Sequence, residues 1–217
     1  MQIRILDETK IVESKGWIAR VRPPSGKWNG RVVLLLHGWT GDENIMWIFA
    51  RKIPTNSWMV APRAPHPIPE GGFAWVVPQN GTRPDITQFS KQTEEILKRL
   101  PDWVPDFSDD TRLDIIGFSQ GAALTYTFCL ETTLTKIAPL AGYLPPGFED
   151  RLKTRNLNGL QVFIAHNTDD TVVSVEQSKK ATYLFLAQEA TVQYYDSTGG
   201  HKLSSSCFHR LDKFLLD

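Results

Sequence analysis

Ser119 is the residue whose surroundings most clearly suggest chemistry. It is the centre of Gly117-Phe118-Ser119-Gln120-Gly121, a G-x-S-x-G pattern between a short apolar run and a helix-compatible stretch. This arrangement predicts a tight strand-to-helix turn that presents the serine hydroxyl as a nucleophile. Both glycines are expected, because a side chain at either position would collide with the crossing strand and helix. The backbone N–H of Gln120, at the helix N-terminus, would then favour negative charge beside the serine.

The G-x-S-x-G pattern alone is a weak signal. Glycine and serine are so common that the pattern arises by chance in about one chain in ten to twenty of this length. The alternative interpretation is a strand-to-helix turn that requires glycine but performs no chemistry. Catalytic partners for the serine, placed on neighbouring elements, distinguish the two interpretations.

The 217 residues alternate between short apolar runs and helix-compatible stretches, which predicts a single α/β domain over residues 1–217. Its sheet should be mostly parallel, with helices on both faces and no large cap domain. The expected strands are 17–21, 32–36, 58–61, 113–116, 137–140, 161–166 and 191–195. The expected helices are 43–53, 85–100, 121–130, one that begins at Ser174, and a closing helix over 208–215.

Two of the expected helices begin with residues typical of a capping box. These are Asp85 with Gln88 and Ser174 with Gln177. The stretch 62–84 contains six prolines and three glycines, so it is predicted to be a long loop. A loop of this length inside a compact domain usually has a function.

Charge and composition exclude several classes of partner. The chain has 24 Lys+Arg and 24 Asp+Glu residues, so no basic excess indicates nucleic acid or an anionic membrane as a partner. No stretch approaches the ~18 consecutive apolar residues of a membrane span, and the N-terminus lacks the apolar core of a signal peptide. The 2 cysteines and 5 histidines suggest neither a disulfide framework nor a metal site. We therefore expect a cytoplasmic protein with neither nucleic acid nor a membrane span among its features.

The predicted topology gathers several polar residues at one edge of the sheet. In parallel α/β sheets, functional groups lie in loops beyond the carboxyl ends of the strands. Ser119, Asp170 and His201 each come shortly after a predicted strand, and so does the glycine-containing loop 37–42. These positions support the chemical interpretation of the serine.

Six segments follow one another along most of the chain: LLLHGWTGDEN at 34–44, APRAP at 61–65, Gly-Gly and then Trp at 71–75, GFSQGAAL at 117–124, HNTDDTVV at 166–173 and GGH at 199–201. Together they resemble the α/β-hydrolase superfamily and, within it, the small carboxylesterase, phospholipase and acyl-protein thioesterase family. The resemblance implies a catalytic triad of Ser119 as nucleophile, His201 as base and Asp170 as the acid that orients it. It also implies an oxyanion hole made by the backbone N–H groups of Gln120 and of the loop 38–40.

The first departure from the family pattern concerns the oxyanion loop. One extra residue gives His-Gly-Trp-Thr-Gly-Asp at 37–42. The second oxyanion donor is therefore the N–H of either Trp39 or Thr40, and Trp39 is preferred.

The second departure concerns the acid. Thr171 and Ser174 replace two prolines of the family pattern, so Asp169 competes with Asp170 for this role. Asp170 is preferred because Val173 then keeps the position of the family's valine.

The resemblance implies hydrolysis of short- to medium-chain carboxylic esters through an acyl-enzyme. We expect such an enzyme to act on a small molecule, to need no cofactor or metal, and to be a monomer or homodimer. Acyl-thioesters and lysophospholipids are alternative substrates, and a non-catalytic binding protein of the same fold is the alternative from another class. His37 and His166 are interpreted as structural residues, the first near the site and the second ordering the acid loop. The expected substrate contacts are Trp39, Trp75, Phe73 and Leu203, with Trp47 and Leu144 as further candidates.

Overall fold

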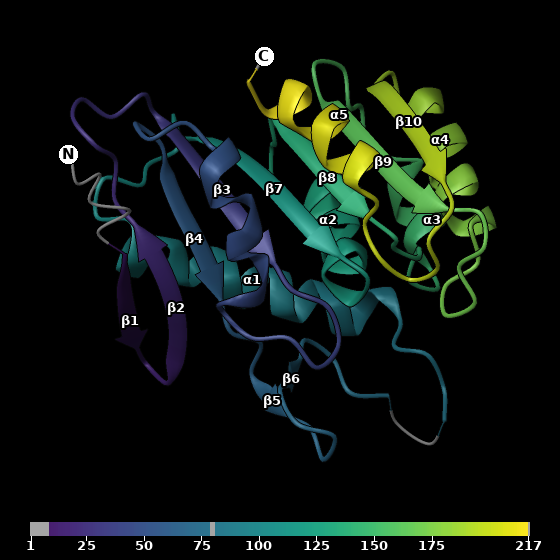
Figure 1. The fold of residues 1–217 in the computed structure, drawn as a ribbon, viewed down its shortest axis with the longest axis horizontal. Coiled ribbons are helices and arrows are strands. Elements are labelled where there is room, and N and C mark those ends of the chain that lie inside the picture. Colours follow the sequence, from purple (N-terminus) through teal and green to yellow (C-terminus); the bar gives the residue numbers. More distant parts are fainter. Residues whose placement is uncertain (1–8, 79–80, 217) are drawn as a thin grey trace.

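The computed structural model of the protein describes residues 9–78 and 81–216. The strands of the main sheet are β1 Lys10–Ser14, β2 Trp17–Arg22, β3 Arg31–Leu36, β4 Trp58–Pro62, β7 Arg112–Phe118, β8 Lys136–Leu140, β9 Gln161–Asn167 and β10 Thr191–Ser197. They form an 8-stranded sheet in the order β1-β2-β4-β3-β7-β8-β9-β10 (Figure 1). All strands from β4 to β10 in this order run parallel, and β2 pairs antiparallel with both β1 and β4.

The mostly parallel sheet confirms the predicted fold class. Its interior strands read as continuous apolar runs because helices cover them on both faces. In β3, every residue is buried. Val32, Leu34 and Leu36 pack into one hydrophobic cluster, whereas Val33 and Leu35 pack into another on the opposite face.

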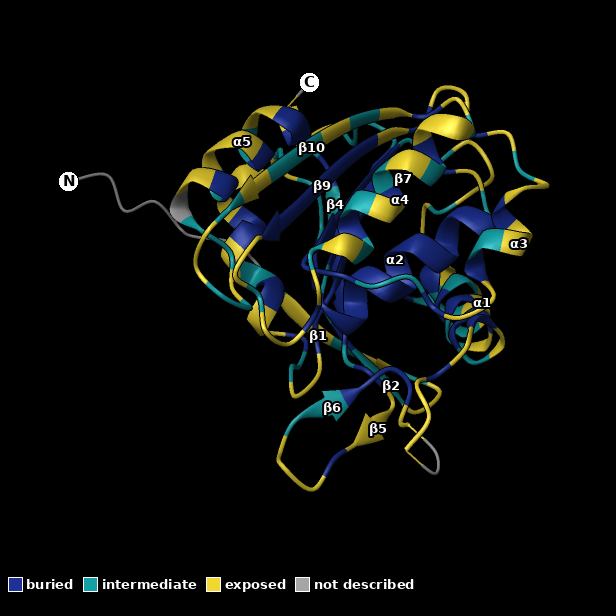
Figure 2. Cartoon of the chain, turned by 90° about the vertical axis from the view of Figure 1, so that its right-hand side faces the viewer, coloured by how far each residue is buried: buried dark blue, intermediate teal, exposed yellow. Residues whose placement is uncertain are grey.

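Two layers of helices enclose the sheet (Figure 2). One layer consists of α1 Ile86–Trp103, α2 Gln120–Glu131, α3 Phe148–Leu152 and α4 Glu176–Ala187. The other layer consists of the 3-10 helix η1 Ile45–Lys52 and the C-terminal helix α5 Ser205–Leu216. Each layer contributes its apolar side chains to the cluster on its own face of the sheet.

The two predicted capping boxes have different outcomes. At the start of α1, the side chain of Asp85 accepts from the backbone of Gln88, whose own side chain accepts from the backbone of Asp85. The second prediction is wrong, because α4 begins at Glu176 without a side-chain cap. The amide oxygen of Gln177 instead accepts from the backbone N–H of Leu144, so a tertiary contact replaces the local one.

The proline-rich stretch 62–84 is less irregular than predicted. It contains a small hairpin of β5 His66–Pro67 and β6 Phe73–Ala74, which projects from the main sheet in Figure 1. Residues 79–80 of the stretch lie outside the described residues. The hairpin lies against the loop that follows β3, since the N–H of Phe73 donates to the carbonyl of Gly41 at 3.0 Å.

Candidate active site

The predicted nucleophile, Ser119, occupies a strained turn between β7 and α2. Its backbone has φ 54° and ψ −114°, a conformation that non-glycine residues rarely adopt. A Cβ at Gly117 would lie 2.2 Å from Oγ1 of Thr125, and a Cβ at Gly121 would lie 2.2 Å from the carbonyl oxygen of Leu36. The turn therefore requires both glycines.

The hydroxyl of Ser119 begins a chain of hydrogen bonds through three side chains. Its Oγ lies 2.9 Å from Nε2 of His201, and Nδ1 of His201 lies 2.7 Å from Oδ2 of Asp170. Because an ionised carboxylate only accepts hydrogen bonds, Nδ1 carries the ring proton and donates a hydrogen bond to Asp170. In the neutral ring, Nε2 is then free to accept the serine proton. The fold thus brings together three residues that lie far apart in the sequence.

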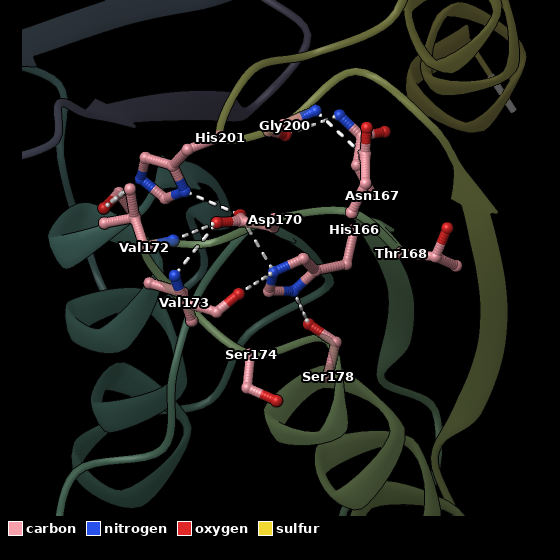
Figure 3. Close-up of polar contacts among 12 residues, drawn as sticks. His166, Asn167, Thr168, Asp170, Val172, Val173, Ser174, Ser178, Gly200 and His201 are labelled. Atoms are coloured by element: carbon pink, nitrogen blue, oxygen red, sulfur yellow. Dashed lines mark hydrogen bonds and ion pairs between the residues drawn. The ribbon is translucent and has the colours of Figure 1, made fainter.

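The side chain of Asp170 is fully buried, and both of its oxygens accept two hydrogen bonds (Figure 3). Oδ1 accepts from the backbone N–H groups of Val172 and Val173 at 2.8 and 2.9 Å. Oδ2 accepts from His201 and, at 3.1 Å, from Nε2 of His166. Burial raises the pKa of Asp170, but the hydrogen bonds from His201 and the two amides more than compensate and hold this pKa below its usual range. Asp170 is therefore negatively charged at neutral pH.

The competing carboxylate, Asp169, has different partners. It accepts from the backbone N–H groups of Gly199 at 2.8 Å and Gly200 at 2.9 Å. These hydrogen bonds, the one from Gly200 most of all, lower the pKa of Asp169. Asp169 thus anchors the backbone of the loop that carries His201, whereas Asp170 contacts the imidazole itself.

Asn167 anchors the same loop, and sequence reasoning does not identify it. Its Nδ2 donates to the carbonyl oxygens of Gly200 and Lys202, both at 2.8 Å, and its Oδ1 accepts from the hydroxyl of Ser197. The last residue of β9 thereby holds the backbone on both sides of His201. Its two carbonyl partners lie 33 and 35 residues further along the chain, so no local pattern indicates these contacts.

The predicted oxyanion loop follows β3 and turns tightly between Gly38 and Gly41. The N–H of Gly41 donates to the carbonyl of Gly38 at 3.1 Å, and Thr40 has a φ of 67°. Among the described residues, neither the N–H of Trp39 nor that of Thr40 has a protein acceptor. The N–H of Gln120 lies in the first turn of α2, where a helix offers no internal acceptor. All three N–H groups are therefore available to a bound anion.

The hairpin of β5 and β6 packs against the outer side of the loop between Gly38 and Gly41. Gly72, just before β6, has φ 76°, and a Cβ there would lie 2.0 Å from the carbonyl oxygen of Thr40. Glycine at position 72 therefore lets the hairpin pass directly over the turn. Nearby, the guanidinium of Arg63 makes two hydrogen bonds to Glu43, at 2.6 and 2.7 Å, and lies 4.7 Å from the ring of Phe73. Phe73 is thus packed against a cation.

The side chain of Gln120 ties the end of the hairpin to the serine turn. Its Oε1 accepts from the N–H of Trp75 at 2.8 Å, and its Nε2 donates to the carbonyl of Val76 at 2.7 Å. Trp75 itself is fully buried, with its indole N–H donating to the carbonyl of His37 at 2.7 Å. The structure therefore places Trp75 in the core beneath the site and not on the wall of the pocket where we expected it.

His37 is a buried neutral residue next to the predicted oxyanion loop. Its Nε2 accepts from the N–H of Ala64 at 3.0 Å, so Nδ1 carries the proton and donates to the carbonyl of Gly38 at 2.7 Å. Burial lowers the pKa of His37 more than its hydrogen bond and nearby carboxylates raise it. This neutral imidazole links the loop after β3 to the segment after β4.

An apolar pocket of about 430 Å³ lies beside His201, the hydrogen-bond partner of Ser119. Small-molecule sites commonly have volumes of this order. The pocket opens to solvent over η1, where Ile45 is 56% exposed and Ile48 is 59% exposed. Its apolar lining consists of Trp39, Ile45, Met46, Ile48, Phe49, Phe118, Leu203 and Phe208.

The expected substrate contacts are only partly gathered around this pocket. Trp39 and Leu203 line it. The other three candidates, Phe73, Trp47 and Leu144, do not line it. The ring of Phe73 lies against Arg63, and the ring of Trp47 lies 4.2 Å from the guanidinium of Arg20.

Within residues 9–78 and 81–216, no group of three or more His, Cys, Asp and Glu side chains could hold a metal ion. None of the helices in those same residues is both long enough and apolar enough to cross a membrane.

The model of the phospholipase/carboxylesterase family matches residues 18–216 of this chain. The chain belongs to the phospholipase/carboxylesterase family. No curated protein matches the sequence of this phospholipase/carboxylesterase family member.

Solved structures share the fold of this family member over most of its length. The carboxylesterase from Mesorhizobium loti matches with a TM-score of 0.80 and 19% identity, covering 97% of this chain and 99% of that one. The Bacillus cereus carboxylesterase matches with a TM-score of 0.76 and 20% identity, over 96% and 93% of the two chains. Zea mays acyl-protein thioesterase 2 matches with a TM-score of 0.70 and 20% identity, over 91% and 97%. These similarities show the α/β-hydrolase fold.

Proposed function

We propose that this protein is a serine hydrolase that cleaves carboxylic esters through an acyl-enzyme. The observation that carries the proposal is the chain of hydrogen bonds from Ser119 through His201 to Asp170. A serine hydroxyl is a weak nucleophile unless a neighbouring base takes its proton, and His201 lies at the required distance. Membership of the phospholipase/carboxylesterase family supports the same reaction class.

Acylation begins when Oγ of Ser119 attacks the carbonyl carbon of the ester and Nε2 of His201 takes the hydroxyl proton. Asp170 stabilises the resulting imidazolium through its hydrogen bond with Nδ1. The proton then passes from Nε2 to the leaving oxygen, so that an alcohol departs and the acyl group stays on Ser119.

Deacylation repeats this sequence with water. Water gives a proton to Nε2 of His201 and attacks the acyl carbon. The carboxylic acid leaves, and Oγ of Ser119 recovers its proton from the imidazolium.

The oxyanion of each tetrahedral intermediate is bound by two backbone N–H groups. We assign one to Gln120 and the other to Trp39, with Thr40 as the alternative. In comparable sites, losing one such donor costs roughly 3–4 kcal/mol of transition-state stabilisation. The availability of these amides to an anion supports this assignment.

The substrate we propose is an ester whose acyl group is short to medium in length. The pocket lined by Trp39, Phe118 and Leu203 is apolar and adjoins His201, so it suits a hydrocarbon group. An acyl-thioester is the second candidate, because the same chemistry cleaves it and one structural neighbour is named an acyl-protein thioesterase.

A panel of p-nitrophenyl esters tests the proposal directly. Acetate, butyrate, octanoate and palmitate esters are compared with a butyryl thioester, using wild-type protein and Ser119→Ala. We expect hydrolysis by the wild type, with kcat/KM highest at butyrate or octanoate, and loss of about 10⁶-fold in kcat for the variant. Equal rates for both proteins, or no hydrolysis of any ester or thioester, would contradict the proposal and favour a non-catalytic binding protein.

A further inference from the structure

His166, the second histidine that is hydrogen-bonded to Asp170, lies on the opposite side of this carboxylate from His201 (Figure 3). It is the next-to-last residue of β9, and its side chain is completely buried. Nε2 lies 3.1 Å from Oδ2 of Asp170 and 2.9 Å from the carbonyl oxygen of Val173, while Nδ1 lies 2.6 Å from Oγ of Ser178. The imidazole therefore joins β9, the acid loop and the first turn of α4.

These partners define where the proton of His166 resides. The carboxylate of Asp170 and the carbonyl of Val173 are acceptors only, so Nε2 must carry the proton. Nδ1 then has a lone pair and accepts from the hydroxyl of Ser178. Burial lowers the pKa of His166 more than its contacts with Val173 and Asp170 raise it, so the ring stays neutral at neutral pH. His166 is thus a neutral donor with one fixed tautomer.

Oδ2 of Asp170 consequently accepts from two imidazoles at once. His201 approaches at 2.7 Å and His166 at 3.1 Å. Oδ1 is already bonded to two backbone amides. Without His166, only the imidazole of His201 would locate Oδ2, and that ring is the group that changes charge in each proposed proton transfer.

We propose that His166 is a positioning residue, which holds Oδ2 of Asp170 opposite Nδ1 of His201 and moderates the attraction of this carboxylate for the imidazole proton. The inference rests on the proposed function, in which His201 is the base. A neutral N–H group that donates to a carboxylate disperses part of its negative charge. When that donor is removed, the carboxylate attracts the proton of His201 more strongly.

The titratable groups around His166 are few. Asp170 and His201 face it from the loops after β9 and β10, and Asp196, its register partner on β10, is exposed to solvent. Behind Ser178, the phenol of Tyr126 on α2 is fully buried, and burial raises its pKa, so it remains neutral. Asp170 is therefore the group through which His166 influences the pH dependence.

Two substitutions at His166 separate positioning from packing. His166→Leu removes the donor, whereas His166→Gln keeps an N–H near the position of Nε2. We expect His166→Leu to lower kcat about 10- to 100-fold, as for one lost hydrogen bond to a charged group, with KM little changed. The acid limb of its kcat/KM profile should also move to higher pH, while His166→Gln stays close to wild type in both respects. His66→Leu, at an exposed histidine of β5, is the matched control.

A second readout is independent of catalysis. Ring-nitrogen NMR of His201 is followed across a pH series in the wild type and the variants. We expect the imidazolium of His201 to persist to higher pH in His166→Leu than in the wild type. Ser178→Ala removes the hydrogen bond to Nδ1 of His166, so the tautomer of His166 is no longer fixed. It should shift the titration of His201 in the same direction by less. This variant replaces His166→Leu in the experiment if His166→Leu does not fold.

The outcomes are distinct. Equal losses in His166→Leu and His166→Gln, with the pH profile and the NMR titration unmoved, would mean that His166 only fills space, and would overturn the inference. The proposed function fails separately, by undiminished hydrolysis in Ser119→Ala or by the absence of any hydrolysis. In either case the NMR titration of His201 still decides the inference.

Discussion

Replacing Asp170 by asparagine is the substitution for which the structure makes the most specific forecast. The carboxylate is surrounded by four N–H donors: the amides of Val172 and Val173 and the imidazoles of His166 and His201. An asparagine has only one oxygen to offer them, and its NH2 group can only donate. If that oxygen replaces Oδ1, which two amides bind, the NH2 group must face Nδ1 of His201.

This exchange forces His201 into the wrong tautomer. Nδ1 would have to accept from the asparagine, so the neutral ring would carry its proton on Nε2 and could no longer take one from Ser119. In the template serine protease the corresponding change lowers kcat by about 10⁴-fold without disturbing the geometry. We expect a loss of this order in Asp170→Asn.

The neighbouring carboxylate provides the matched control. Asp169→Asn keeps an oxygen that accepts from Gly199 and Gly200, whose hydrogen bonds with Asp169 lie at the surface. Its loss of kcat should stay within about tenfold, since such hydrogen bonds each contribute little on balance. Steady-state kinetics with p-nitrophenyl butyrate compares the two variants. A 10⁴-fold loss in Asp169→Asn with a nearly normal Asp170→Asn would refute the assignment of the acid.

Three further perturbations follow from the same contacts. Gly72→Ala places a Cβ 2.0 Å from the carbonyl oxygen of Thr40, in the proposed oxyanion loop, and should lower kcat by up to about 10²-fold. Gly71→Ala also places a side chain at a positive φ, but nothing lies within 4 Å of its Cβ, so kcat should stay near the wild-type value. The pKa values of His37 and His166 are lower in the folded state than in the unfolded state. Acidification below about pH 6.5 therefore protonates these histidines in the unfolded state first, which lowers the free energy of unfolding. The loss is at most about 1.4 kcal/mol per pH unit for each histidine. Leu203→Trp partly fills the apolar pocket and should lower kcat/KM for octanoate more than for acetate.

Each of these three has its own measurement and contrary result. The two glycine variants are compared by kcat with p-nitrophenyl butyrate, and equal losses would mean that backbone strain, not the clash, is responsible. Urea unfolding at about pH 7.5 and about pH 5.5 measures the histidine effect. Stability that is unchanged or higher at the lower pH would contradict it. For Leu203→Trp, equal losses on both esters would place the acyl group outside the pocket.

The parts of the fold that were predictable are those governed by local chemistry. β3 and β9 are buried on both faces, so each contains an uninterrupted apolar run, at 32–36 in β3 and at 162–165 in β9. The turn at Ser119 is recognisable because glycine is needed on both sides of it. The cap formed by Asp85 involves residues within a single helical turn, and the pattern identifies it.

The features that escaped prediction depend on contacts between distant segments. Gln177 matches a capping box but bonds to Leu144, 33 residues earlier. A tryptophan in a proline-rich stretch is as compatible with a pocket wall as with the core. Trp75 can be buried because its indole N–H donates to the carbonyl of His37, a contact that the sequence does not indicate. Asp169 and Asp170 are adjacent carboxylates, and the side-chain directions that distinguish them depend on the loop after β10. The position of Val173 favours Asp170 in the sequence, but the other two differences have no counterpart in residue type or spacing.

The most direct test of the account is covalent labelling of the proposed nucleophile. Wild-type protein is treated with a fluorophosphonate, and its intact mass and the labelled peptide are determined by mass spectrometry. We predict a single adduct on Ser119, formed rapidly in the wild type, slowly in Asp170→Asn and not at all in Ser119→Ala. An adduct on another residue, or equal labelling of Ser119→Ala, would contradict the claim that the turn between β7 and α2 carries the nucleophile.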